Sequence, residues 1–323
     1  MATEAAIPVQ PAQREYRTWI LDSRRWQHYR PRPGDVVVAT YPKCGTTWMQ
    51  QIVLLLIFQD TEPRPVMEIA PWVDRRFPAP AEAVMADLEA QEHRRSMKSH
   101  LPADGLPLHD EVKYIHVVRD GRDACMSYHH HICGLTPEVL AIMDRIGLED
   151  ETIGRPYPRP PADAAEFFRS WISEAAVPGH EDGSPFYSFF EGERAWWRVR
   201  HRPNVLLVHY NDLKADTAGE MRRVADFLGM AVPERVWPQL VEAAGFEAMR
   251  ANGEKLMGRI AGTFRGGAEH FFHKGTNGRW RDVLSEADLA LYNAKVEQKF
   301  SPALAEWVAG GRAAVGDPRT APD

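Results

Sequence analysis

Reactive side chains are concentrated in one short stretch, Tyr41-Pro42-Lys43-Cys44-Gly45-Thr46-Thr47-Trp48. A β-branched run over residues 35–40 precedes it, and a mostly apolar run over residues 49–58 follows. This pattern predicts a buried strand, a tight loop, and a helix whose first turn holds Thr46 and Thr47. Such a loop directs backbone N–H groups at one point, which suits a phosphate or sulfate. We therefore predict that a phosphorylated nucleotide binds here and that a group is transferred from it.

Three further side chains that can do chemistry follow predicted strands. His100 ends a short segment at residues 94–100, Arg119 follows the apolar run 112–118, and Tyr210 ends the run 205–210. Helical segments separate these strands, which predicts βαβ units and a parallel sheet. Because ligands bind at the carboxyl ends of parallel strands, we expect the three side chains to lie near Lys43.

The same pattern predicts the architecture. We expect an α/β fold with a central parallel sheet flanked by helices, carrying a phosphate-binding strand–loop–helix like that of nucleotide kinases. One domain over residues 14–310 accounts for the core, with a flexible tail at 1–13 and a C-terminal tail at 311–323. Residues 135–161 are polar and rich in proline and glycine, and we interpret them as a weakly helical excursion or a mobile lid.

Composition limits the function classes. The net charge of -6 argues against general binding to nucleic acid or to an anionic membrane, so an anion site must be local. The three cysteines have neither disulfide-scaffold nor zinc-type spacing, and the N-terminus does not resemble a signal peptide. The longest purely apolar run, Ile52 to Phe58, is too short to span a membrane. A cytoplasmic protein is predicted, and the preference for arginine over lysine indicates a bacterial source.

A nucleoside-triphosphate site fits the first loop poorly. That signature places lysine directly after the last glycine, as in G-x-x-x-x-G-K-[ST]. Here Lys43 precedes Gly45, and Thr-Thr-Trp follows the glycine.

The order Tyr-Pro-Lys-x-Gly-Thr-Thr-Trp instead resembles the cytosolic sulfotransferase family, and further matches extend from Asp35 to Trp280. The resemblance implies that the loop binds the 5′-phosphosulfate of 3′-phosphoadenosine 5′-phosphosulfate, and that adenosine 3′,5′-bisphosphate is the product. The residues that it implicates here are Lys43, Cys44, Gly45, Thr46, Thr47 and Trp48. Cys44 stands where serine is usual, and a thiol is a weaker hydrogen-bond donor than a hydroxyl.

Two more matches imply a site for the 3′-phosphate. Arg119 with Ser127, eight residues later, is similar to the family's pair at a strand end and on the next helix. A guanidinium and a hydroxyl so placed can hold one phosphate. The segment His273-Lys274-Gly275-Thr276-Asn277-Gly278-Arg279-Trp280 resembles the family's loop over that phosphate, in which His273, Lys274 and Gly275 are expected to bind. His273 replaces the usual arginine, so a permanent charge is lost.

A fourth match, Met97-Lys98-Ser99-His100-Leu101-Pro102, implies the chemistry. In the family the histidine is the catalytic base, so His100 is expected to take the proton of an acceptor hydroxyl. Lys43 would stabilise the leaving phosphate, and Lys98 would assist near the sulfuryl oxygens. The family needs no metal. Three consecutive histidines on one helix, 129–131, point in different directions, so we interpret them as structural or acceptor-lining.

The remaining implied contacts are aromatic. Trp48, Tyr210 and Phe246 resemble residues that contact the adenosine part of the nucleotide. For the acceptor we expect an apolar body with one hydroxyl, such as a phenol, steroid, lipid or glycolipid. The expected acceptor contacts are Trp72, Phe77, Phe186, Tyr187 and Phe190. Whether the chain forms a homodimer is left open.

Two alternatives to a sulfotransferase remain at this point. A nucleotide-dependent kinase or other phosphotransferase would bind ATP and magnesium at the same loop. A catalytically silent member would bind the nucleotide alone; the replacements at Cys44 and His273 favour it, and the presence of Lys43 and His100 opposes it.

Overall fold

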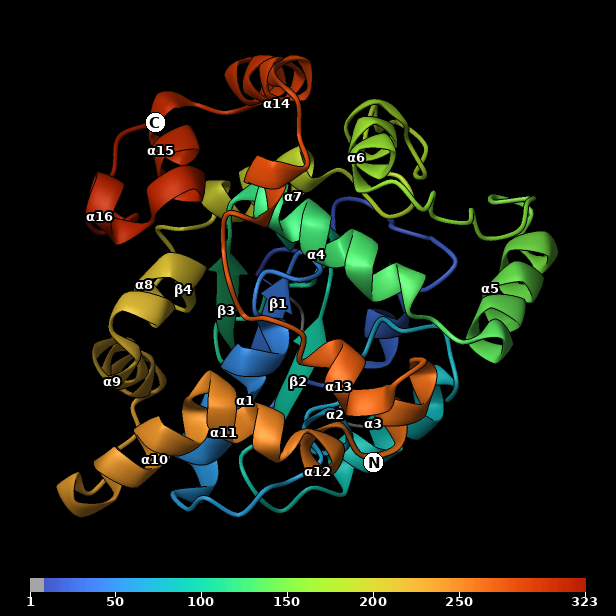
Figure 1. Ribbon diagram of the computed structural model, residues 1–323. Coiled ribbons are helices and arrows are strands. Elements are labelled where there is room, and N and C mark those ends of the chain that lie inside the picture. The colour runs from blue at the N-terminus through green and yellow to red at the C-terminus, as the bar shows by residue number, and fades with distance from the viewer. Residues whose placement is uncertain (1–8) are drawn as a thin grey trace.

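Four short parallel strands form the centre of the described part of the chain, residues 9–323, in the computed structural model (Figure 1). Their spatial order is β2-β1-β3-β4, and every neighbouring pair is parallel. The strands are β1 Val36–Thr40, β2 Ser96–Ser99, β3 Lys113–Val118 and β4 Val205–His209. All positions but Lys113 are buried, as expected for strands covered on both faces. The predicted α/β fold with a central parallel sheet is confirmed.

Two apolar layers cover the two faces of this sheet. Val36 and Val38 belong to one layer, whereas Val37 and Ala39 belong to the other, because successive side chains of a strand point to opposite faces. The first layer is completed by α1 Thr46–Phe58, α9 Thr217–Leu228 and α10 Trp237–Ala244. The second is completed mainly by α4 Gly121–Cys133, α6 Ala164–Ser173, α7 Phe189–Arg198 and α15 Pro302–Gly310.

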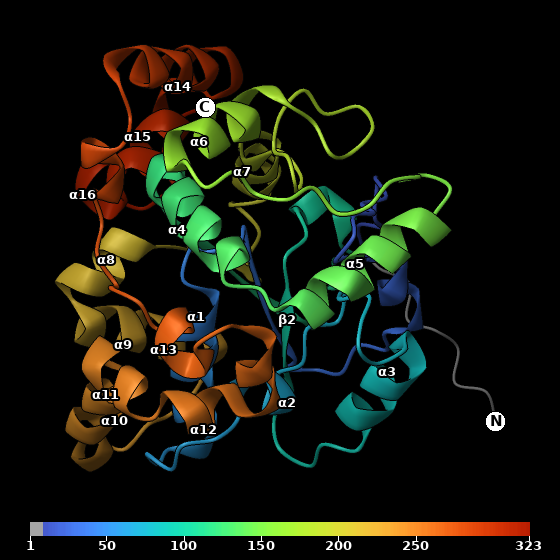
Figure 2. The same cartoon turned by 45° about the vertical axis from the view of Figure 1, so that its right-hand side comes forward.

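Shorter elements surround these layers. The other α-helices are α2 Val66–Ile69, α3 Ala81–Glu89, α5 Pro137–Glu149, α8 Tyr210–Ala215, α11 Phe246–Ala251, α12 Gly253–Met257, α13 Gly267–Phe271, α14 Glu286–Lys299 and α16 Arg312–Val315. The 3₁₀ turns are η1 Ser23–His28, η2 Ala103–Gly105, η3 Glu234–Val236, η4 Gly258–Thr263 and η5 Arg279–Asp282. The orange helix α12 contacts both α2 and α13, and the three lie in the lower half of Figure 1 and Figure 2.

The segment 135–161 contains a regular helix, α5, where the sequence suggested a weakly helical excursion. Thr136 caps its start by accepting from the backbone N–H of Val139, and Pro137 occupies its first turn. Asp150 ends the helix and forms ion pairs with Arg17 at 2.6 Å and Arg76 at 2.8 Å. These contacts attach α5, which follows α4 in Figure 2, to the N-terminal part of the chain.

Both predicted tails can be compared with the structure only in part. Residues 1–8 of the expected N-terminal tail lie outside the described residues, whereas Gln10 exchanges backbone hydrogen bonds with Leu108 at 3.2 and 2.8 Å. Within 311–323, the carbonyls of Pro318 and Ala321 accept from the buried guanidinium of Arg200 at 2.9 and 3.0 Å. Among residues 9–323 no helix combines the length and apolar character needed to cross a membrane.

Candidate active site

The loop between β1 and α1 places its amide groups at one edge of the sheet. Lys43 adopts φ 68°, a left-handed conformation that is uncommon for a residue with a side chain. Gly45 follows at φ 110°, and a Cβ added there would approach the Tyr210 ring to 3.1 Å. The first turn of α1 has no side-chain cap, so its N–H groups are not occupied by a capping side chain. A helix start of this kind is suited to bind an anion.

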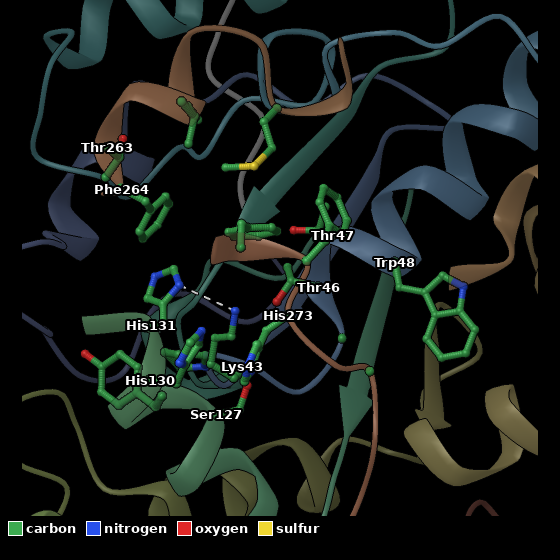
Figure 3. Close-up of a pocket in the computed structure, with 18 of the residues that line it drawn as sticks. Lys43, Thr46, Thr47, Trp48, Ser127, His130, His131, Thr263, Phe264 and His273 are labelled. Carbon is green, nitrogen blue, oxygen red and sulfur yellow. Dashed lines mark hydrogen bonds between the residues drawn. The ribbon is translucent and has the colours of Figure 1, made fainter. Parts of the chain in front are cut away.

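Lys43 is the cation of this loop. Its ammonium lies 4.5 Å from the centre of the Phe271 ring and 3.4 Å from Nδ1 of His131, the contact drawn dashed in Figure 3. Burial, aided by Arg119 and Arg279, lowers the pKa of Lys43 to about 8. An incoming anion would compensate this cation and restore its preference for the charged form.

Arg119, directly after β3, connects the loop to Thr276 and Asn277. Its guanidinium donates to Oδ1 of Asn277 at 2.8 and 3.0 Å, to the carbonyl of Thr276 at 2.8 Å and to the carbonyl of Lys43 at 3.2 Å. The side chain is 5% exposed, and all these acceptors are uncharged. Because hydrogen bonds to a charged acceptor are stronger, an oxyanion would compete well for this guanidinium.

The segment 275–279 is held over Arg119 by three elements. Asp123 of α4 accepts from the N–H groups of Gly278 at 2.7 Å and Arg279 at 3.3 Å. Lys214 of α8 donates to the carbonyl of Gly275 at 3.0 Å. Gly275 has φ 61°, and a Cβ there would lie 2.7 Å from the Phe246 ring, so this position requires glycine.

Three imidazole rings form a stack beside this segment. His130 of α4 lies between His270 and His273, with ring centres 4.2 and 4.0 Å away. Nε2 of His130 and Nε2 of His270 each donate to the other residue's carbonyl, at 3.2 and 3.0 Å. Burial lowers the pKa of His130 to about 4, so this central ring is uncharged near neutral pH. Within residues 9–323 no group of three or more His, Cys, Asp or Glu residues has the arrangement of a metal site.

His100 follows β2 in a fixed orientation. Its Nδ1 donates to the carbonyl of Thr40 at 2.7 Å, because a carbonyl can only accept. Nε2 is therefore the unprotonated nitrogen, and His100 is one of the residues lining the cavity described below. Burial, together with Lys98 and Lys43, holds the pKa of His100 well below its ordinary value. The geometry is that of a neutral base with one defined accepting atom.

Lys98 and Trp72 lie beside this histidine. The Trp72 ring meets the His100 ring edge-on at 4.7 Å, and the Lys98 ammonium lies 4.3 Å from the centre of the same indole. Burial and the neighbouring Arg75 lower the pKa of Lys98 to about 7. Asp74 fixes this corner by accepting from the indoles of Trp72 and Trp26 and from the backbone N–H of His100.

Lys43, Arg119, His100, Lys98 and Trp72 all border one cavity of about 540 Å³. We call one part of it the polar end; it is formed by Lys43, Gly45, Thr46, Thr47, Trp48, Arg119, Ser127, Tyr210, Phe246, His273, Lys274, Gly275 and Arg279. We call the other the apolar end; it is formed by Ile20, Phe77, Ile132, Leu135, Val139, Met143, Phe186, Met257, Ile260, Phe264 and Phe271. His100 lies at the junction of the two ends, because its ring is 6.3 Å from the Phe186 ring while the charge of Lys43 acts on it. Trp72 and Lys98 lie beside it. Figure 3 shows Lys43 and Ser127 in the same view as Phe264.

The structure therefore brings together most of the side chains predicted from sequence, with three corrections. Cys44 does not line the cavity: its side chain is fully buried in the apolar core, so its thiol does not face the ligand. Tyr187 lies edge-on to Tyr41 at 5.3 Å, and Phe190 packs against Phe300 at 5.4 Å. Both rings are core residues, and of the expected run only Phe186 reaches the cavity.

Several lining residues were missed in the sequence. Arg279 lies inside a recognised motif and could have been selected there as a second cation beside Arg119. His131 was not missed entirely, because the histidine run 129–131 was interpreted as structural or acceptor-lining; it lines the cavity four residues after Ser127, on the same helix face. Arg75, Val139 and Met143 carried no signal, because they stand in segments without a motif.

Comparison with known proteins gives consistent results. Residues 33–303 match the model of the sulfotransferase domain family. A glycolipid sulfotransferase of Mycobacterium tuberculosis is 33% identical over 308 residues, covering 92% of this chain and 94% of the relative. A rabbit (Oryctolagus cuniculus) sulfotransferase 1C2 is 26% identical, covering 84% and 86%. The structure of a retinol dehydratase in complex with androsterone and inactive cofactor PAP superposes with a TM-score of 0.66 at 23% identity, covering 87% of each chain.

Proposed function

This chain belongs to the sulfotransferase domain family, and we propose that it transfers a sulfuryl group from 3′-phosphoadenosine 5′-phosphosulfate to a hydroxyl of an amphiphilic acceptor. One observation carries the proposal: His100, with its accepting nitrogen defined, lies at the junction of a cationic and an apolar part of one cavity. A nucleotide bearing two phosphate groups fits the polar end, and an apolar acceptor fits the other.

The polar end offers two sets of donors for the nucleotide. The N–H groups at the start of α1, with Lys43, Thr46 and Thr47, would hold the 5′-phosphosulfate. Arg119, Ser127, Lys274 and the segment 273–275 would hold the 3′-phosphate, and Arg279 adds a cation beside them. Trp48, Tyr210 and Phe246 provide aromatic faces for the adenine. The product of transfer, adenosine 3′,5′-bisphosphate, would keep both sets of contacts.

His100 would act as the general base. Nε2 accepts the proton of the acceptor hydroxyl while the hydroxyl oxygen forms its bond to sulfur. In the free protein burial, together with the Lys98 and Lys43 charges, holds down the pKa of His100. Because the nucleotide is an anion, its binding offsets these two cations and raises the basicity of His100. Occupation of the polar end would thus prepare the base for the second substrate.

Lys43 would stabilise the leaving group. As the bond from sulfur to the bridging oxygen breaks, the electron pair stays on the 5′-phosphate, and the Lys43 ammonium can donate to it. The left-handed backbone at Lys43 fixes where this side chain starts, and His131 holds its ammonium in the free protein. Lys98, at the junction, is placed to donate to the sulfuryl oxygens.

For the acceptor we propose a glycolipid or a related amphiphile. The mycobacterial relative is named a glycolipid sulfotransferase, and this chain spans 94% of its length. The apolar end provides matching chemistry, because α5 and the segment 256–271 contribute aliphatic and aromatic side chains to it. A hydroxyl at the head of such a molecule would reach His100 while its hydrocarbon part is removed from water.

Nucleotide binding and product mass test this function together. We expect adenosine 3′,5′-bisphosphate to raise the melting temperature, with about 2.7 kcal/mol of stabilisation at a hundredfold excess over Kd. With the phosphosulfate donor, an extract of glycolipids and a panel of phenols should yield products that have gained one sulfo group.

Each alternative predicts a different result in the same experiment. Stabilisation by ATP with magnesium and not by the bisphosphate would favour a kinase and would overturn the proposal. Binding of the bisphosphate without sulfo transfer to any acceptor would favour a silent member. His100→Ala is the reference for the last case, because it should bind the bisphosphate as the wild type does but lose most of its turnover.

A further inference from the structure

Arg75 is a cation in the cavity wall that the proposed reaction does not use. It follows Asp74 in the segment between α2 and α3 and lines the cavity on the side of Trp72 and Phe77. Its guanidinium lies 4.6 Å from the centre of the Phe77 ring and 5.8 Å from that of Trp72. The same Trp72 ring contacts His100 at 4.7 Å, so Arg75 and the base share a neighbour.

The guanidinium has no polar partner among the described residues. Nε is buried without a hydrogen bond, and neither a side-chain hydrogen bond nor an ion pair is formed by Arg75 within residues 9–323. Burial alone lowers its pKa to about 10, and no carboxylate offsets that effect. The adjacent Asp74 is engaged by Trp26, Trp72 and the backbone of His100.

The neighbouring Arg76 shows what a structural arginine looks like in the same segment. Arg76 donates to the carbonyl of Thr18 at 2.9 Å and pairs with Asp150 at 2.8 Å. Removing a charge from water without such a partner is unfavourable, and stacking on aromatic rings offsets only part of that cost. The rings therefore do not balance the charge of Arg75, and a ligand anion would.

We propose that Arg75 binds an oxyanion on the acceptor: a carboxylate, sulfate or phosphate attached to the molecule whose hydroxyl meets His100. This inference rests on the proposed function and narrows the acceptor class to anionic amphiphiles. The cavity wall supports it, because Phe77 and Phe186 enclose an apolar body while the fork of a guanidinium suits two oxygens of one anion. An uncharged acceptor would leave this half-buried cation unpaired.

Matched acceptors test this inference. We compare three phenolic carboxylates of increasing length with their carboxamides, which have a similar shape but no charge. The first is built on one aromatic ring, the second on two fused rings and the third on two linked rings. For at least one length we expect the wild type to favour the carboxylate by about 10–100-fold in kcat/KM, as a charge-assisted hydrogen bond allows. Arg75→Gln should reduce this preference to about one, because it lowers turnover of the carboxylate much more than turnover of the carboxamide.

Two control variants separate this role from a structural one. Arg75→Lys should keep part of the preference, because it keeps the charge but not the fork. Arg76→Gln changes the neighbouring arginine, which has its own carboxylate partner, and should keep the wild-type preference even if stability falls. If Arg75→Gln does not fold, the wild-type ratio and Arg75→Lys still decide the question.

The outcomes also distinguish this inference from the proposed function. Equal turnover of carboxylates and carboxamides by the wild type would overturn the inference while leaving sulfo transfer established. If Arg75→Gln loses turnover equally on the carboxylate and the carboxamide, the guanidinium acts on the sulfuryl group that is transferred. This result would also overturn the inference. If no acceptor is sulfated, Arg75 can still be tested by binding. Tryptophan fluorescence then compares the Kd of each carboxylate with that of its carboxamide for the bisphosphate-loaded protein.

Discussion

At the polar end of the cavity most contacts come from backbone groups and from side chains one or a few residues after a strand. At the apolar end they come from unrelated segments: Ile20 near the N-terminus, Val139 on α5 and Phe264 after η4. Hydrogen bonds hold the polar end in place, because Arg119 and Asp123 connect the segment 275–279 to the end of β3 and to α4. The segments of the apolar end are joined by side-chain packing and by a few polar contacts outside the cavity, such as the ion pairs of Asp150 with Arg17 and Arg76.

This difference separates two tasks. A charged nucleotide needs donors at fixed positions, and hydrogen bonds from loops beside a sheet provide them. An apolar body needs only a volume of the right polarity, which can change residue by residue without altering the sheet. The polar end can thus keep the same nucleotide while the residues of the apolar end change and select a different acceptor. His100 lies where the two tasks meet.

The largest effect is expected at that junction. His100→Ala removes the accepting Nε2, and general-base catalysis contributes typically 10²–10⁴-fold, so kcat should fall by about that factor. The Kd for adenosine 3′,5′-bisphosphate, measured by calorimetry, should stay near the wild-type value because the polar end is unchanged. If nucleotide affinity falls together with kcat, His100 also contributes to nucleotide binding, and the two ends of the cavity are coupled through it.

Arg119→Ala should act on the nucleotide instead. Loss of charge-assisted bonds worth about 1.5–3 kcal/mol predicts bisphosphate binding weaker by roughly 10–150-fold. Adenosine 5′-monophosphate, which lacks the 3′-phosphate, serves as the control ligand and should lose much less affinity. Equal losses for both nucleotides would mean that Arg119 acts by ordering Thr276 and Asn277 rather than by binding phosphate.

The same contrast explains which residues could be predicted from the sequence. Lys43, Arg119 and Tyr210 were predicted because local spacing places them at strand ends, and strand ends meet at one edge of a parallel sheet. Tyr187 was assigned wrongly, because an aromatic residue in a turn fits a core as well as a cavity, and only tertiary packing against Tyr41 decides. Arg75 had no motif, and its lack of a partner is a property of the folded chain alone.

Helix α5 is a second example of a feature that the sequence did not predict. Its start signals, Thr136 followed by Pro137, were present in the sequence, but the surrounding proline and glycine residues favoured an irregular segment. The contribution of Val139 and Met143 to the apolar end depends on the docking of α5 through Asp150. Such long-range ion pairs leave no periodic trace in a sequence.

A smaller effect should appear as a pH dependence of the free protein. Burial gives Lys98 a pKa of about 7 and Lys43 a pKa of about 8, both below the ordinary lysine value. The unfolded chain therefore binds more protons than the folded chain above pH 7, and stability should rise with pH towards about pH 9. Thermal melts of the apo protein measure this rise. Lys98→Met should flatten it, and a melting temperature that falls over this range in the wild type would contradict the burial of the two lysines.

The smallest effect on nucleotide binding is expected from Cys44→Ser, which introduces the residue usual in the family. Because the Cys44 side chain lies in the core, the new hydroxyl would be enclosed there, at a cost of about 1–3 kcal/mol without a partner. We expect a lower melting temperature and an unchanged Kd for the bisphosphate. Thr47→Ala is the matched change on the cavity side of the loop, and it should weaken binding while leaving stability almost intact. If Cys44→Ser instead binds the bisphosphate more tightly, the side chain at position 44 contacts the nucleotide. In that case the loop would not bind the nucleotide through its backbone alone at this position.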